Sequence, residues 1–318
     1  MTNQIFCGKI INKYKILDCK TEVKELAETI SPLRYPGGKS KLAPLVRYIV
    51  ENKTTNKINT YIEPFAGGAG VALDLLINGS VENIIINDYD KSIYSFWKAV
   101  LTESERFIQT IRLTPVNITE WQRQKKIYST YNDRYSFELG FATFFLNRTN
   151  RSGILSAGPI GGYDQTGNYL LDVRFNKEKL INRIEKIAKY RSHIKVYNKD
   201  IRSFIRLVIV KNQENSFVYF DPPYFSKGKE LYINYFVAED HAEIRDAIIH
   251  NVRCQWIITY DDEKSISSLY DGYTQRTYDL SYSLANKGIA SELIIFSEEE
   301  LCPNNTELIQ AGVKTILS

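Results

Sequence analysis

Short apolar runs typical of strands alternate along this chain with segments in which apolar residues recur at helical spacing. The strand-like runs are NTYIEPF (59–65), NIIINDYD (83–90), IKVYN (194–198), SFVYFDPPY (216–224) and CQWIITYDD (254–262). Helical spacing occurs at 42–50, from about 71 to 79, at 176–190 and at 239–250. The runs YTQRTYDLSYSL (273–284) and SELIIFS (291–297) predict a closing hairpin. Strands that alternate with helices in this way indicate an α/β fold with a mostly parallel sheet.

The stretch between about residues 100 and 190 departs from this alternation, because it contains few strand-like runs. We therefore predict a discontinuous α/β domain, formed by residues 31–100 and 191–318, with a mainly helical insert at 101–190. Residues 1–30 form an N-terminal extension, to which we assign no role. Within this extension the charged segment TEVKELAETI (21–30) is predicted to be helical.

The segment SPLRYPGGKSKLAPLV (31–46) looks like a nucleotide-binding loop, because glycines, a lysine and a serine precede a helix. A P-loop requires Gly, four residues and then Gly-Lys-Ser/Thr, all after a buried strand. The first glycine would fall at Leu33, and the preceding segment has the pattern of a helix rather than a strand. A phosphate-binding loop is therefore a poor interpretation. The local pattern leaves open whether Tyr35 and Lys39 hold another group or only precede a helix.

The composition is that of an ordinary soluble globular protein, with 43% hydrophobic and 25% charged residues. No apolar run reaches the ~18 residues of a membrane span, and the N-terminus lacks the continuous apolar core of a signal peptide. The four cysteines show no CxxC spacing, which favours a reducing compartment, so we expect a cytoplasmic protein without membrane association. The three histidines are isolated, and we expect no metal site.

The net charge of +4 is unevenly distributed along the chain. Residues 1–100 carry +3, residues 101–200 carry +7 and residues 201–318 carry −6. The basic middle part also interleaves aromatic and cationic residues, as in WQRQKKIYSTYNDRY (121–135). Such a segment suits a phosphate backbone with stacked bases. An ordinary solvated helical face would have the same composition, so both interpretations stay open at this point.

The first candidate binding site is YIEPFAGGAGVAL (61–73), which combines a strand, a glycine-rich turn and the start of a helix. Glycines let a ligand approach the backbone, and a helix N-terminus favours polar or anionic groups. Asp88 ends the next strand, 20 residues after Gly68, where open α/β sheets place a carboxylate that binds a ribose. Alone, this arrangement fits NAD, FAD or S-adenosylmethionine, since all three contain adenosine. The alternative is a tight turn without a ligand.

The second candidate site is VYFDPPYF (218–225), where an apolar strand ends in Asp221, Pro222, Pro223 and Tyr224. Two prolines cannot continue a central strand, so they predict a rigid loop at the carboxyl edge of the sheet, where α/β proteins bind ligands. The Asp221 carboxylate and the Pro222 carbonyl can each accept an N–H, and the Tyr224 ring can stack on a planar ring. The combination suits a planar ring that bears an exocyclic NH₂ group. The alternative is a simple Pro-Pro turn.

The motifs LRYPGGK, YIEPFAGGAGVAL, INDYD, FFLNRTNRSG and FDPPY, in this order, resemble those of the D12 class of DNA adenine-N6 methyltransferases, the Dam-like group. The resemblance spans roughly residues 31–297. It implies a Rossmann-like, S-adenosylmethionine-dependent methyltransferase sheet in residues 31–100 and 191–318, with residues 101–190 as the DNA target-recognition domain. It also implies methyl transfer to the N6 amino group of adenine in a specific double-stranded DNA sequence, by base flipping and direct in-line transfer.

The resemblance assigns roles to individual residues. Asp221, Pro222 and Tyr224 would be catalytic, with the first two accepting the hydrogens of the target amino group and the third stacking on its ring. Lys39 would be the counter-charge of the cofactor carboxylate. The implied S-adenosylmethionine-binding residues are Tyr35, Lys39, Phe65, Gly67, Gly68, Asp88, Asp200, Ile201 and Asp221.

Double-stranded DNA is the implied partner of the insert, and a cognate restriction endonuclease is a candidate partner of the whole protein. The segment FFLNRTNRSGILSAGPIGGYD (144–164) places Asn147, Arg148, Asn150 and Arg151 before a glycine-rich hairpin. Arginine recognises guanine and asparagine recognises adenine in the major groove, so these side chains are predicted to contact DNA. A loop with ordinary surface polar residues is the alternative.

Two features depart from the family pattern. The second glycine of the FxGxG-type loop falls on Ala69, and residues 1–30 extend beyond the usual start of the family. The remaining alternatives for the function are a methyltransferase that acts on another amino substrate, such as RNA adenine, cytosine N4 or a protein glutamine, and a non-catalytic DNA-binding relative. The large insert and the PGGK segment favour DNA over the first, and Lys39, Asp88, Asp221 and Tyr224 argue against the second.

Overall fold

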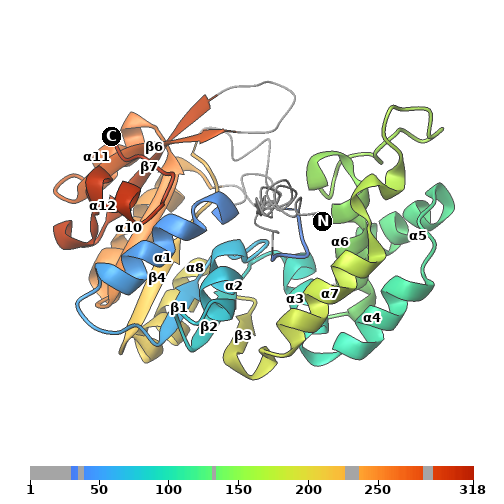
Figure 1. Ribbon diagram of the computed structural model, residues 1–318, viewed down its shortest axis with the longest axis horizontal. Coiled ribbons are helices and arrows are strands. Elements are labelled where there is room, and N and C mark those ends of the chain that lie inside the picture. The colour runs from blue at the N-terminus through green and yellow to red at the C-terminus, as the bar shows by residue number, and fades with distance from the viewer. Residues whose placement is uncertain (1–29, 35–38, 131–133, 226–235, 282–288) are drawn as a thin grey trace, which may run out of the picture.

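A seven-stranded sheet forms the centre of the molecule (Figure 1). The computed structural model describes residues 30–34, 39–130, 134–225, 236–281 and 289–318. The strands, in the order β3-β2-β1-β4-β5-β7-β6, are β1 (Thr60–Glu63), β2 (Asn83–Asn87), β3 (Ile194–Tyr197), β4 (Ser216–Phe220), β5 (Gln255–Asp261), β6 (Thr274–Ser281) and β7 (Ile289–Phe296). Strands β1 to β5 pair in parallel, and β7 pairs antiparallel with both β5 and β6. The expected Rossmann-like α/β sheet and its closing hairpin are therefore confirmed.

The strand order places a ligand crevice at the carboxyl edge of the sheet. The chain leaves β1 toward β2 on one side, whereas β4 lies on the other side of β1. Loops that leave the two neighbouring strands β1 and β4 thus diverge to opposite faces, and open α/β sheets bind ligands in the gap between such loops. The glycine-rich turn follows β1 and the DPPY segment follows β4, so the two candidate sites of the sequence meet at this gap.

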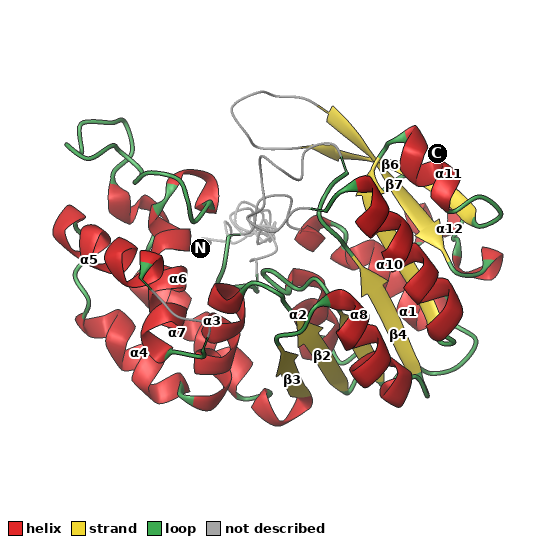
Figure 2. Cartoon of the chain, turned by 180° about the vertical axis from the view of Figure 1, so that it is seen from behind, coloured by secondary structure: helices red, strands yellow, loops and turns green. Residues whose placement is uncertain are grey.

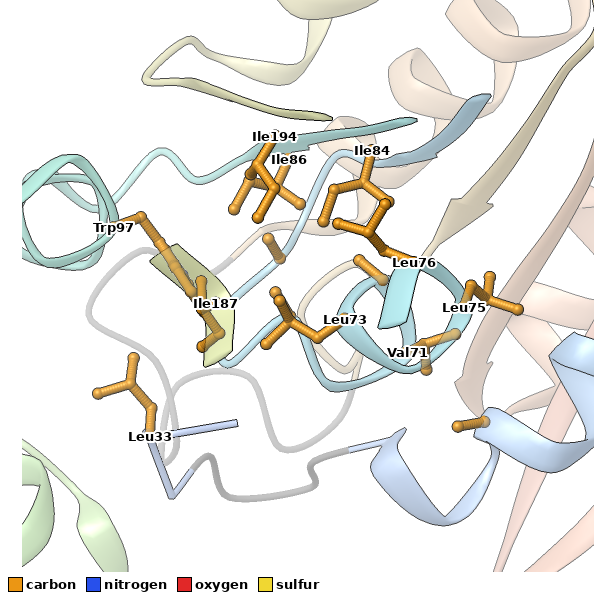
Figure 3. Close-up of a cluster of buried hydrophobic side chains, with 14 of the residues drawn as sticks. Leu33, Val71, Leu73, Leu75, Leu76, Ile84, Ile86, Trp97, Ile187 and Ile194 are labelled. Carbon is orange, nitrogen blue, oxygen red and sulfur yellow. The ribbon is translucent and has the colours of Figure 1, made fainter. Parts of the chain in front are cut away.

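Helices cover both faces of the sheet because successive strand residues alternate between two hydrophobic clusters. In β1, Tyr61 belongs to the first cluster and Ile62 to the second. The first face is covered by α1 (Ala43–Asn52), α2 (Gly70–Ile77) and α3 (Lys91–Thr102), and the second by α8 (Ile201–Phe204), a π-helical turn (Ile205–Ile209), α10 (Ala238–Asn251) and α11 (Lys264–Leu269). Figure 3 shows part of the first cluster, where Ile84 and Ile86 of the sheet lie over Leu73 and Leu76 of α2.

The insert packs on one side of the sheet domain as a group of helices (Figures 1 and 2). Its helices are α4 (Ser104–Leu113), α5 (Ile118–Ser129), α6 (Phe137–Thr149) and α7 (Lys177–Ala188). Stacked and edge-to-face rings join it to α3: the centroid of Phe96 on α3 lies 6.0 Å from that of Phe144 on α6 and 5.8 Å from that of Phe107 on α4. Helix α3 runs through the predicted boundary at residue 100, so the insert shares one hydrophobic core with the sheet domain.

The predicted helices are present close to their expected ends. The pattern at 176–190 forms α7, whose first turn is capped by the Asn176 side chain, and the pattern at 239–250 forms α10. The glycine-rich hairpin expected after Arg151 is wrong in detail, because residues 150–176 form turns, short 3-10 helices and one antiparallel bridge, between Asn150 and Pro159. Left-handed backbone angles at Ser152 and at several glycines interrupt any regular strand there.

The remaining short elements are η1 (Lys39–Lys41), η2 (Arg151–Gly153), η3 (Leu171–Arg174), η4 (Arg191–His193), η6 (Val210–Asn212), η7 (Glu299–Leu301) and α12 (Asn305–Gln310). The helix predicted at 21–30 lies, apart from its last residue, outside the described residues. Within the part of the chain that the structure describes, no helix has both the length and the apolar character needed to cross a membrane.

Helices α3 and α6 cross at Gly140, and this crossing gives a stability prediction. A Cβ atom at Gly140 would lie 2.5 Å from the backbone oxygen of Ser95 and 2.7 Å from its carbonyl carbon. Backbone cannot move aside as a side chain can, so we expect Gly140→Ala to lower the free energy of unfolding by about 1–3 kcal/mol. Urea unfolding followed by circular dichroism measures this. Gly158→Ala is the control, because its Cβ would meet only side-chain atoms, at 3.4 Å or more, and an unchanged stability of Gly140→Ala would contradict the tight crossing.

Candidate active site

A cleft of about 1100 Å³ lies at the carboxyl edge of the sheet and extends to the insert. It is lined by residues from the ends of β1, β2 and β4, from the start of α8 and from α6, η3 and α7. The structure brings most of the residues predicted from the sequence into this one cleft, namely Lys39, Phe65, Gly68, Asp88, Asn147, Arg148, Asp200, Ile201 and Asp221. Tyr35 lies outside the described residues.

A buried ionic network joins Lys39, Asp221 and Glu292. The Lys39 ammonium lies 3.3 Å from Asp221 Oδ1 and also pairs with Glu292 Oε2. Burial alone would lower the pKa of Lys39, but the carboxylates of Asp221 and Glu292 raise it above its usual value. Lys39 is therefore a cation that neutralises two carboxylates of the protein itself. Its predicted role as counter-charge of a ligand carboxylate stays a prediction.

The Asp221 carboxylate sits at the end of β4 in a fixed orientation. Thr259 on β5 donates its hydroxyl to Asp221 Oδ1 at 2.9 Å, and the Thr259 hydroxyl also bonds to the hydroxyl of Tyr219. Burial raises the pKa of Asp221, the Lys39 ammonium lowers it and Glu292 raises it, with a result of about 6. Asp221 is therefore ionised at neutral pH and can accept hydrogen bonds from a ligand.

Tyr224 is buried, and a hydrogen bond from its hydroxyl holds the side chain in place. Its side chain is only 5% exposed, and its hydroxyl donates to Glu292 Oε1 at 2.6 Å. The Lys39 ammonium lies 5.2 Å from the centroid of its ring. Pro222 is buried, and neither Pro222 nor Tyr224 is among the residues that line the cleft, whereas Pro223 is. The predicted stacking by Tyr224 and acceptance by the Pro222 carbonyl thus stay predictions.

The turn after β1 adopts the left-handed conformation that glycine favours, at both Gly67 (φ 45°) and Ala69 (φ 47°). Ala69 therefore occupies a glycine-like position, which costs about 1–2 kcal/mol of strain, and the departure from the family pattern leaves the turn intact. The turn is fixed from both sides. Gly67 N donates to Asp88 Oδ2 at 2.9 Å, and the Trp97 indole donates to the Gly67 carbonyl at 2.8 Å.

Carboxylates accumulate along the sheet side of the cleft. Burial and the neighbouring Asp90 raise the pKa of Asp88 to about 7, and burial and Asp221 raise the pKa of Glu63 well above its usual value. Asp200 caps α8 through a bond from Ser203 N to its Oδ1 at 3.0 Å. The raised pKa values of Asp88 and Glu63 come first from burial and then from neighbouring carboxylates, so this part of the cleft suits a ligand that carries positive charge.

Only two of the four residues predicted to contact DNA share the cleft. Asn147 and Arg148 line it, whereas Arg151 is exposed outside it. Asn147 is 1% exposed, and its amide bonds to the backbone N–H and carbonyl of Arg34 and to the carbonyl of Gly153. Asn150 is fully buried. Its amide accepts from the Trp121 indole at 2.7 Å and donates to two carbonyls of the following loop. In this structure neither asparagine side chain is available to a base.

Sequence reasoning missed several residues of the site. Glu292 and Thr259 lie within apolar strands, β7 and β5, and Glu63 ends β1 beside the glycine-rich turn. The available signal was a charged or polar residue inside a run that otherwise reads as buried strand, since such residues need a partner. The identity of that partner depends on strand order, which local sequence patterns do not specify. Among the described residues, no group of three or more His, Cys, Asp or Glu side chains is placed to hold a metal ion.

Comparisons of the sequence with known proteins support the resemblance seen in the motifs. Residues 35–282 match the family model described as D12 class N6 adenine-specific DNA methyltransferase. Type II methyltransferase M.MjaIII of Methanocaldococcus jannaschii is 26% identical over 204 residues, which cover 60% of this chain and 68% of that protein. Type II methyltransferase M.CviBI of Paramecium bursaria Chlorella virus NC1A is 24% identical, with 79% and 90% coverage. The solved rRNA methyltransferase aviRa from Streptomyces viridochromogenes has a TM-score of 0.39 at 11% identity, with 88% and 90% coverage.

The burial of Asn150 gives a second prediction. Asn150→Ala removes an acceptor and two donated bonds from the interior and leaves the Trp121 indole N–H without its partner. We expect the free energy of unfolding to fall by about 2–4 kcal/mol, because each unsatisfied buried polar group costs about 1–3 kcal/mol. Chemical denaturation measures this, with Asn168→Ala, at an exposed position of the same insert, as the control. Wild-type stability together with loss of DNA binding would instead support a direct contact with a base.

Proposed function

The chain belongs to the family of D12 class N6 adenine-specific DNA methyltransferases, and from this premise we propose that it methylates the N6 amino group of adenine in a specific double-stranded DNA sequence. As a DNA methyltransferase it must bring a methyl donor and a target base to the same place. The observation that carries the proposal is the position of Asp221, ionised and rigidly held at the meeting point of the glycine-rich turn and the DPPY segment.

S-adenosylmethionine is the proposed methyl donor, and the residues present fit it. The donor carries an ammonium and a sulfonium, and the sheet side of the cleft is rich in carboxylates, of which Asp88 and Glu63 have pKa values raised by burial and by neighbouring carboxylates. The turn at Gly67–Ala69 brings backbone to the cleft edge, and Asp88 stands at the end of β2, where α/β sheets bind a ribose. When bound, the donor supplies an activated methyl group. We propose Lys39, Phe65, Gly68, Asp88, Asp200 and Ile201 as its contacts, together with Tyr35, Gly67 and Asp221.

Asp221 and Pro222 act on the target amino group. The N6 lone pair of adenine is delocalised into the ring, so the nitrogen is a weak nucleophile. Lys39 and Thr259 both contact Oδ1 of Asp221, and we propose that Oδ2 accepts one N6 hydrogen while the Pro222 carbonyl accepts the other. These bonds direct electron density back to nitrogen and stabilise the positive charge that develops there. Catalysis then rests on positioning and electrostatics, without a covalent enzyme intermediate.

Tyr224 is proposed to flank the target ring after the base has left the duplex. Extrusion of a base costs a few kcal/mol, and stacking on an aromatic side chain returns about 1–3 kcal/mol. The bond from the Tyr224 hydroxyl to Glu292 ties the ring to the network that holds Asp221, through Lys39. The hydroxyl therefore has a positioning role, and the face of the ring has the contact role.

DNA binding is assigned to the insert side of the cleft. Arg148 and the exposed Arg151 are proposed contacts, since arginine binds both phosphates and guanine edges. The buried amides of Asn147 and Asn150 would then support DNA binding by holding the loop that begins at Arg151. A cognate restriction endonuclease remains a proposed partner, suggested by the Type II names of the two relatives.

The third prediction tests the reaction itself. We expect purified protein to form N6-methyladenine in duplex DNA, and Asp221→Ala to reduce the single-turnover rate by about 100-fold or more while the fold persists, because an electrostatic contact made in the transition state is lost. Labelled S-adenosylmethionine and nucleoside analysis give the product and the rate, and long-read sequencing gives the target sequence. The exposed Asp262→Ala is the control. Formation of N4-methylcytosine, or cofactor binding without any methyl transfer to DNA, would contradict the proposal.

The fourth prediction concerns pH. The pKa of Asp221 is about 6, and the Lys39 ammonium lowers it. Because the ionised carboxylate is the hydrogen-bond acceptor, kcat/KM should rise with pH through this value. In Lys39→Gln the lowering influence is lost, so the acidic limb of the profile should move to higher pH. Lys57→Gln, which removes an exposed lysine, should leave the limb in place. An acidic limb at the same pH in Lys39→Gln and the wild type would contradict the coupling.

A further inference from the structure

Four arginines from four separate segments line the insert side of the cleft. They are Arg34, before η1, Arg148 on α6, Arg174 on η3 and Arg183 on α7. Together with Lys179 they are the charged lining residues that the described part of the chain contributes on this side, and all of them are basic. The side of the cleft that faces the sheet carries most of its carboxylates. The two sides of the cleft therefore differ in charge, and the arginine cluster lies opposite the candidate active site.

Two guanidinium nitrogens of the arginine cluster lack the partners that buried donors normally have. Arg34 Nη1 and Arg148 Nε are buried, and neither has a hydrogen-bond partner in the described part of the chain. Neither side chain pairs with a described carboxylate. Burial, and then the charges of Arg183, Arg34 and Arg174, lower the pKa of Arg148 to about 9. Cations are rarely buried without a partner, because desolvation and mutual repulsion both oppose it.

The fold nevertheless holds these cations together. Asn147 accepts from Arg34 N at 2.6 Å and donates to the Arg34 carbonyl at 2.7 Å, which clamps the Arg34 backbone beside α6. Gly153 makes the approach possible, because a Cβ there would lie 2.5 Å from the Arg34 carbonyl oxygen. Arg148 follows Asn147 directly in the sequence. The buried Asn147 amide, which the sequence predicted to contact DNA, thus holds Arg34 close to Arg148.

We propose that the arginine cluster is a phosphate subsite, which takes a backbone phosphate of the target DNA strand close to the flipped adenine. This inference rests on the proposed function and adds the subsite to it. Guanidinium groups bind phosphate oxygens with directed, charge-assisted hydrogen bonds, and the two orphan nitrogens are free donors for them. A phosphate held here, across the cleft from Asp221, fixes the backbone of the extruded nucleotide while its base points toward the sheet.

The other anion in the reaction is the carboxylate of S-adenosylmethionine, and charge argues against it as the occupant. The cofactor carries this carboxylate together with an ammonium and a sulfonium, so its overall charge is positive and the arginine cluster repels it. The carboxylates on the sheet side attract it instead. A DNA strand carries a phosphate at every nucleotide and no cation, so it gains from the whole cluster.

Phosphate neutralisation combined with mutation provides the test. Duplexes carry a single methylphosphonate at each linkage around the target adenine in turn, once the target sequence is known. With wild-type protein we expect one or two linkages at which neutralisation weakens binding about 10-fold or more. In Arg148→Gln and Arg174→Gln, neutralisation of the same linkages should change DNA affinity little, because the arginine that pairs with the phosphate has been removed. The slope of log affinity against log salt should fall by about one per lost phosphate contact. Arg206→Gln, at an exposed position outside the cleft, should keep the wild-type pattern.

A structural role for Arg148 predicts a different result. Loss of an unpaired buried cation should raise the thermal midpoint of free Arg148→Gln, whereas loss of a structural contact should lower it. The exposed Arg174 provides a second variant that cannot disturb the core. The proposal fails if each methylphosphonate weakens DNA binding by the same factor in the wild type and in both variants. It also fails if both variants lose affinity for S-adenosylmethionine while their DNA binding still depends on the same phosphates. Absence of DNA methylation by the wild type would instead defeat the proposed function.

Discussion

The placement of Lys39 between Asp221 and Glu292 is the contact on which the site depends. It joins the segment before α1 to the end of β4 and to β7, three parts of the chain that are distant in sequence. Burial alone would raise the pKa of Glu292, but Lys39 and the Tyr224 and Tyr278 hydroxyls hold it below its usual value. Removal of one partner from a buried pair costs about 3–5 kcal/mol, since the other charge is left uncompensated. The network therefore fixes the orientation of Asp221 and Tyr224 together.

The cleft separates two kinds of charge that the reaction has to handle. Carboxylates with raised pKa values, such as Asp88 and Glu63, line the sheet side, and the arginine cluster lines the insert side. A cationic methyl donor and a polyanionic DNA strand would each lower the energy of the side it meets. In the free protein, like charges therefore repel one another on each side of the cleft, and ligand binding relieves this repulsion. Such perturbed charged groups are common at functional sites.

The shared core fixes the sheet side and the insert side of the cleft at a constant separation. Helix α3 begins in the sheet domain and supplies Phe96 to the ring cluster of the insert, while Trp97 binds the glycine-rich turn. A rigid helix that contacts both parts transmits their relative position better than a flexible linker would. The predicted boundary at residue 100 therefore divides the sequence pattern but does not divide the packing.

Local sequence determined the α/β class, the main helices and strands, and the two loops that carry the site, because periodicity and turn residues act over a few positions. The family motifs added the reaction and most of the cleft residues. Tertiary structure alone decided that Lys39 pairs with Glu292, that Asn147 and Asn150 are buried and that four dispersed arginines converge. The physical reason is that a polar side chain has the same identity in the sequence whether its partner is water, a base or a buried backbone group. Only strand order and helix packing choose the partner.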